Sequence, residues 1–159
     1  MNESLARLQI LVVDDSEYMR GVMRTVLRAI GVTKVHEAEN GAAAIGVLRE
    51  TPIDIIFADW MMQPMSGPEL IQFLRSSDAS PNPYIPIVMV TAHTEMRNIK
   101  QARDIGVTEF LAKPITAKSV FERLVAIIER PRPFIRAKEY FGPDRRRQVK
   151  TFKGGEKRT

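Results

Sequence analysis

The sequence predicts an α/β fold with a doubly wound, five-stranded parallel sheet, followed by a basic and largely disordered C-terminal tail. Five short apolar runs alternate along the chain with segments that carry helix-capping and helix-ending residues. The runs are apolar almost throughout, which is typical of parallel strands that helices cover on both faces. Such sheets bind ligands outside the carboxyl ends of their strands.

Each expected strand is a short apolar run that stops at a polar residue. Asp14 and Asp15 follow the first run, Asp59 the third, Thr91 the fourth and Lys113 the fifth. Because the carboxyl ends of parallel strands meet at one edge of the sheet, we expect these five side chains to lie together. The expected strands cover residues 9–13, 32–38, 53–58, 85–90 and 108–112.

The expected helices begin at capping residues and end at glycine or proline. Ser16 can cap a helix that Gly31 ends, and Thr116 can cap a last amphipathic helix that continues to about Glu129. Pro131 and Pro133 follow that last helix and prevent its continuation. The expected helices cover residues 16–30, 41–50, 68–75, 95–105 and 116–129.

The composition excludes several classes of protein. The 159 residues include no cysteine, which excludes disulfides and thiolate zinc sites. No apolar run is long enough to cross a membrane, and residues 1–8 are too polar for a secretory signal. We therefore expect a cytoplasmic protein without a membrane partner.

Charge divides the chain into two parts, a domain over residues 1–129 and a tail over residues 130–159. The tail holds 11 basic and 3 acidic residues, whereas the remainder holds 13 basic and 16 acidic residues. A basic tail on an acidic body indicates two separate tasks. The tail should attract an anion: a nucleotide, a nucleic acid, a membrane surface or an acidic protein face.

The acidic cluster at the strand ends indicates phosphoryl chemistry. Asp14, Asp15 and Asp59 would repel one another, and oxygen ligands with room for water suit Mg²⁺. A carboxylate beside Mg²⁺ can attack a phosphoryl group, while the Lys113 ammonium and the Thr91 hydroxyl stabilise its oxygens. One aspartate after one strand would carry little information, but the ordered set of all five residues is hard to obtain by chance.

The sequence resembles the response-regulator receiver (CheY-like) family over about residues 7–130. The segments that carry the resemblance are "ILVVDDSEYMR", "IIFADWMMQPMSG", "IVMVTAH" and "FLAKPI". The resemblance implies a flavodoxin-like fold in which Asp59 is the phosphoacceptor. It also implies that Asp15 ligates Mg²⁺ directly, Asp14 through water, and Met61 through its backbone carbonyl. Thr91 and Lys113 would contact phosphoryl oxygens, and the peptide bond before Pro114 would be cis.

Two further residues follow from the same resemblance. Phe110 occupies the position of the switching aromatic of the family, although a phenylalanine on the last strand is equally expected as a core residue. Met61 is bulky and cannot orient water by hydrogen bonds, so we expect the phosphorylated protein to lose its phosphoryl group slowly.

The tail combines arginines with aromatic residues and a turn. Arginine forks can bind guanine and phosphate, aromatic rings stack on bases, and a carboxylate accepts from the N–H edge of guanine. The tail resembles, over about residues 130–148 and best in "YFGPDRRR", the arginine-rich extension of CheY-like effectors that bind cyclic di-GMP. The ligand could be one molecule or a stacked pair, and a disordered solubilising tail is the plain alternative. The candidate contacts are Arg132, Arg136, Tyr140, Asp144, Arg145, Arg146 and Arg147.

These features predict a single-domain response regulator that acts as a signalling adaptor and not as an enzyme. A sensor histidine kinase or a phosphotransfer protein would phosphorylate Asp59, and cyclic di-GMP would bind the tail. A protein target, such as the flagellar motor switch, would bind near Phe110. The first alternative is a phosphorelay or motor-binding receiver whose tail docks on an acidic protein. The second, less favoured, is a nonspecific nucleic-acid binder.

Overall fold

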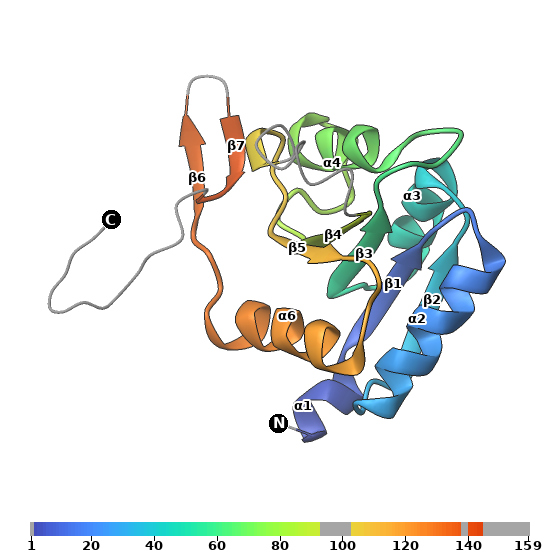
Figure 1. The fold of residues 1–159 in the computed structure, drawn as a ribbon. Coiled ribbons are helices and arrows are strands. Elements are labelled where there is room, and N and C mark those ends of the chain that lie inside the picture. The colour runs from blue at the N-terminus through green and yellow to red at the C-terminus, as the bar shows by residue number, and fades with distance from the viewer. Residues whose placement is uncertain (1, 93–102, 138–139, 145–159) are drawn as a thin grey trace, which may run out of the picture.

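A five-stranded parallel sheet forms the centre of the computed structural model, which describes residues 2–92, 103–137 and 140–144 (Figure 1). The strand order is β2-β1-β3-β4-β5, and all neighbouring strands are parallel. The predicted fold class is therefore confirmed. The strands are β1 (Gln9–Val13), β2 (Lys34–Ala38), β3 (Ile55–Asp59), β4 (Ile87–Thr91) and β5 (Glu109–Ala112).

The helices begin where side chains cap their first turn. Ser16 accepts a hydrogen bond from Met19 N, and Thr116 forms a reciprocal capping box with Ser119. A short helix, α1, precedes the sheet and was not predicted, and most of the predicted helix at 95–105 lies outside the described residues. The helices are α1 (Asn2–Arg7), α2 (Glu17–Ala29), α3 (Gly41–Glu50), α4 (Gly67–Ser76) and α6 (Ala117–Glu129).

Two apolar cores lie on the two faces of the sheet. On one face, Leu27 of α2 and Leu124 of α6 pack against the strands, and on the other, Ala44 of α3 and Leu70 of α4 do so. The strands supply both cores because successive residues point to opposite faces. Among the described residues, no helix has the length and apolar character needed to cross a membrane.

The start of the tail is more ordered than we expected. Strands β6 (Phe134–Ala137) and β7 (Tyr140–Pro143) form an antiparallel hairpin, and β7 contacts α4. The sequence has too few apolar residues here to fold alone, and the hairpin packs its aromatic rings against Tyr84 of the α/β domain instead. Residues 145–159 lie outside the described residues.

Candidate functional site

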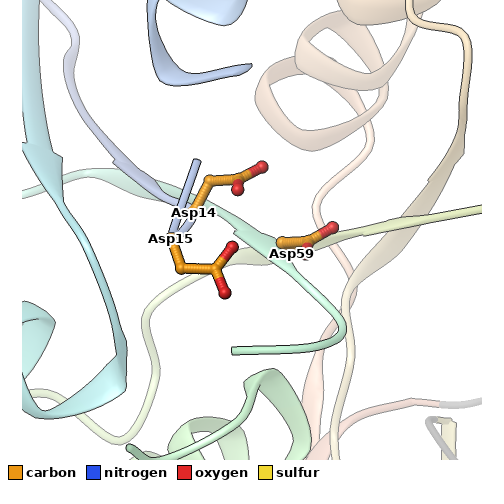
Figure 2. A group of neighbouring side chains, drawn as sticks. All are labelled: Asp14, Asp15 and Asp59. Carbon is orange, nitrogen blue, oxygen red and sulfur yellow. The ribbon is translucent and has the colours of Figure 1, made fainter. Parts of the chain in front are cut away.

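Three aspartates meet at the carboxyl ends of β1 and β3. Asp14 and Asp15 follow β1, and Asp59 ends β3 (Figure 2). These strands pair directly, with Val13 opposite Ala58, so the residues that follow them must be neighbours. One carboxylate oxygen from each aspartate lies within 4.8 Å of the others. The structure thus brings together the acidic cluster that the sequence predicted.

Among the described residues, the Lys113 ammonium forms an ion pair with this cluster. Burial raises the pKa of Asp14, and the nearby Asp59 and Asp15 carboxylates raise it further. A hydrogen bond from Ser16 N to Asp14 Oδ1, at 2.9 Å, and the Lys113 charge oppose that shift. Three carboxylates beside one ammonium fit a divalent cation with oxygen ligands, such as Mg²⁺.

Lys113 reaches the cluster from the end of β5. Its Nζ lies 2.8 Å from Asp59 Oδ1, and its backbone nitrogen donates to Thr91 O at 2.9 Å. The peptide bond between Lys113 and Pro114 is cis, as the resemblance implied. Thr91 ends β4 and is buried beside the same edge, at 1% exposure. All five predicted strand-end residues therefore lie at one edge of the sheet.

The loop after Asp59 folds back over the phosphoacceptor candidate. Gly67 N donates to Trp60 O at 3.1 Å, and a Cβ added to Gly67 would lie 2.4 Å from the Asp59 backbone oxygen. A side chain at this position would therefore push the loop away from Asp59. Met61 lies in the same loop, and its side chain is 65% exposed.

Sequence reasoning missed Arg20, which holds the Asp14 backbone, and the ion pairs that Glu37 forms with Arg20 and Arg24. Arg20 of α2 donates from Nη1 to the Asp14 carbonyl oxygen at 2.6 Å, and its Nε lies 3.1 Å from Glu37 Oε1. Arg24 also forms an ion pair with Glu37. No sequence signal marks this network, because the acceptor at Asp14 is a backbone carbonyl and because Glu37 lies on β2, whereas both arginines lie on α2.

Phe110, the predicted switch residue, lies on β5 and is only partly buried. It packs against the core on the side of α3 and α4. Both expectations for Phe110, a core residue and a mobile aromatic, are compatible with this position.

The tail candidates that the structure describes lie at the other end of β5 from Lys113. Arg132 Nε is 3.5 Å from Glu109 Oε2, at the start of the strand whose far end leads to Lys113. Tyr140 and Asp144 are buried, at 9% and 6% exposure. Arg145, Arg146, Arg147 and the Arg136 side chain lie outside what the structure describes. The described tail candidates, Arg132, Tyr140 and Asp144, lie away from the acidic cluster.

Comparisons with known proteins agree with this geometry. Residues 10–125 match the response regulator receiver domain. Chemotaxis protein CheY-3 of Vibrio cholerae is 32% identical over 123 residues, which cover 77% of this chain and 93% of that protein. Chemotaxis protein CheY of Pseudomonas aeruginosa is 33% identical over 123 residues, which cover 77% and 98%. The solved structure of Vibrio cholerae CheY4 superimposes with a TM-score of 0.68 at 26% identity, covering 76% of this chain and 98% of that one.

Proposed function

Since the chain belongs to the response regulator receiver family and is of the CheY type, we propose that it is a signalling adaptor switched by phosphorylation of Asp59. The donor would be a sensor histidine kinase or a phosphotransfer protein. The observation that carries this proposal is the contact between the Lys113 ammonium and Asp59 beside two further carboxylates.

The residues at the edge of the sheet suit phosphoryl transfer. An Asp59 carboxylate oxygen attacks phosphorus, the bond from phosphorus to the donor breaks, and the donor leaves with that electron pair. The Lys113 ammonium stabilises the negative phosphoryl oxygens, and the Thr91 hydroxyl would donate to another of them. Asp14, Asp15, Asp59 and the Met61 backbone carbonyl would hold Mg²⁺, which would supply further electrostatic stabilisation of the phosphoryl oxygens when bound.

A small phosphodonor tests this proposal without the cognate kinase. The full chain is incubated with acetyl phosphate and Mg²⁺, and its intact mass is followed. The mass of one phosphoryl group should appear in the parent protein and be absent from Asp59→Asn. Asp78→Asn, which changes an exposed aspartate after α4, is the matched control and should behave like the parent. Equal labelling of the parent and Asp59→Asn would contradict the assignment.

A second proposed activity is binding of cyclic di-GMP through the tail. It is supported by the arginine, aromatic and carboxylate residues of the segment 130–148. The output would be a protein contact, for instance at the flagellar motor switch, near Phe110. The alternatives are docking of the tail on an acidic protein and, with less support, nonspecific binding of nucleic acid.

Calorimetry distinguishes these three proposed functions of the tail. Cyclic di-GMP should release or absorb heat on binding the full chain, and Arg145→Ala and Asp144→Ala should each lose that binding. Lys153→Ala, beyond the motif, is the control and should bind like the parent. No heat at ligand concentrations of roughly tens of micromolar would favour a plain receiver whose tail docks on an acidic protein. If single-stranded RNA binds as tightly as cyclic di-GMP, and if binding weakens steeply with salt, the tail is a nonspecific basic arm.

A further inference from the structure

The hairpin of β6 and β7 rests on the receiver through three aromatic rings. Tyr84, in the loop before β4, lies edge-on to Phe134 at 5.2 Å and to Phe141 at 5.4 Å between ring centroids. The two hairpin rings also contact each other, at 5.4 Å. Aromatic pairs with this geometry contribute beyond the area that they bury. Tyr84 therefore joins both hairpin strands to the receiver body.

A buried arginine lies under the same rings. The Arg75 guanidinium is 5.0 Å from the centroid of the Phe134 ring and donates to Gly106 O at 3.0 Å and to Pro83 O at 2.9 Å. Burial lowers the pKa of Arg75 to about 10, so the group remains a cation at neutral pH. A buried cation is stabilised by hydrogen-bond acceptors and by the face of an aromatic ring, and Phe134 of the hairpin supplies that ring.

The backbones of the hairpin and the receiver also approach closely. A Cβ added to Gly142 would lie 3.2 Å from Gly106 Cα and 2.6 Å from the Tyr140 hydroxyl oxygen. That hydroxyl donates to Pro143 O at 2.7 Å, so Tyr140 folds back along its own strand. We name the receiver surface formed by Arg75, Tyr84, Gly106 and Glu109 the seat.

Arg132 and Pro133, which precede β6, hold the end of the hairpin beside the seat. Asp144 N donates to Pro133 O at 2.8 Å, and Arg132 Nη1 donates to Asp144 O at 3.0 Å. Arg132 also pairs with Glu109 of the seat. In the seated hairpin, Asp144 is 6% exposed and Tyr140 is 9% exposed. Little of Tyr140 or Asp144 is therefore open to a nucleotide that approaches the seated hairpin from solvent.

We propose that the seat is a docking surface for the tail and competes with the tail's nucleotide ligand, so that cyclic di-GMP binds only the hairpin that has left the seat. This inference rests on the proposed tail function, since it assigns Tyr140 and Asp144 to the ligand. The apparent dissociation constant then equals the intrinsic constant divided by the fraction of unseated tail. Changes in the seat that touch no ligand should therefore tighten binding.

Tyr84→Ala in the full chain tests this competition. It removes the two aromatic pairs that Tyr84 forms with the hairpin, and Tyr84 is 57% exposed, so the receiver core loses little. We expect cyclic di-GMP to bind this variant about tenfold more tightly than the parent, because two aromatic pairs are lost. Tyr18→Ala, which removes an exposed tyrosine of α2, is the matched control and should leave affinity unchanged.

The outcomes separate this inference from the proposed function. Tighter binding to Tyr84→Ala, or binding that appears only in that variant, supports competition. Equal or weaker binding to Tyr84→Ala overturns competition and leaves the tail's ligand intact. Absence of binding to both proteins overturns both proposals.

Hydrogen exchange supplies a second readout that affinity alone does not give. At saturating cyclic di-GMP, backbone amides of the seat segments 82–86 and 106–109 should exchange faster, because the hairpin no longer covers them. Slower or unchanged exchange in these segments would show that the ligand binds the seated hairpin, and would overturn the inference.

Discussion

The two ends of the sheet are held together by different kinds of interaction. At the carboxyl ends, charged side chains from different strands meet, and Lys113 faces Asp59 at 2.8 Å. At the amino ends of β4 and β5, a buried arginine donates to backbone carbonyls and aromatic rings cover it. Within the described part of the chain, the carboxyl end brings three carboxylates to one ammonium, which suits a cation and a phosphoryl group. The amino end satisfies its charge internally, which suits docking of one chain segment on another.

Gly67 tests how far the carboxyl end depends on backbone contact. Gly67→Ala places a methyl group 2.4 Å from the Asp59 carbonyl oxygen, so the loop must move. We expect a loss of about 1–3 kcal/mol in the free energy of unfolding, together with slower phosphorylation. Chemical denaturation and labelling by acetyl phosphate measure the two effects.

Gly46→Ala is the control for that change. Gly46 lies in α3 with nothing within 4 Å of an added Cβ, so alanine should stabilise the helix by about 0.5–1 kcal/mol. If the two alanine variants had the same stability and labelled equally, close approach at Gly67 would not matter to the site.

Phe134 tests the amino end in the same way. Phe134→Ala removes the ring over Arg75 and the contacts with Tyr84 and Phe141, at a cost of about 1–2 kcal/mol to hairpin docking. The receiver core should unfold nearly as before, while the Asp144 amide, bonded to Pro133 O, loses protection from hydrogen exchange. Unchanged protection would mean that the rings do not hold the hairpin.

Asp14→Asn sharpens the contrast in charge between the two ends. The pKa of Asp14 is higher in the folded protein than in the unfolded chain. Above the folded pKa, ionised Asp14 therefore lowers the free energy of unfolding, and this loss disappears at acid pH, where Asp14 is protonated in both the folded and the unfolded state. With a chelator present, Asp14→Asn should unfold at higher denaturant concentration than the parent at neutral pH. The difference should vanish in acid, below the pKa of the unfolded carboxyl. A variant less stable than the parent at neutral pH would contradict this reading of the site.

Met61→Asn should have the smallest effect. Met61 is 65% exposed, so stability should change by less than about 0.5 kcal/mol. An asparagine amide beside Asp59 can orient water, so the phosphorylated protein should lose its phosphoryl group several times faster than the parent. Decay followed by intact mass after removal of the phosphodonor measures this, and an unchanged rate would show that Met61 does not limit access of water.

The same contrast explains how much could be predicted from the sequence. Asp14, Asp15, Asp59, Thr91 and Lys113 could be placed because each is a distinctive side chain at the end of an apolar run. The helix caps at Ser16 and Thr116 were correct because capping depends on residues three positions away. Features that depend on residues close together in the sequence could therefore be predicted.

The seat could not be predicted because its contacts lack such local signals. Arg75 bonds carbonyls 8 and 31 residues away, and any residue type supplies a carbonyl. The hairpin itself looked too polar to fold, since the ring that completes its apolar contacts, Tyr84, belongs to a distant loop. The assignment of Asp144 to a ligand rested on its residue type, on the adjacent arginines and on the resemblance of "YFGPDRRR", none of which reports burial.

Chemical trapping tests the central assignment at the carboxyl end most directly. The full chain is treated with acetyl phosphate and Mg²⁺ and then with borohydride, which reduces an acyl phosphate of aspartate to homoserine, and the peptides are mapped by mass spectrometry. We expect homoserine at position 59, in amounts that fall when Mg²⁺ is withheld, with none at Asp14 or Asp15. Homoserine at another aspartate, or none at all while phosphoryl label is present, would contradict the assignment of Asp59 as the phosphoacceptor.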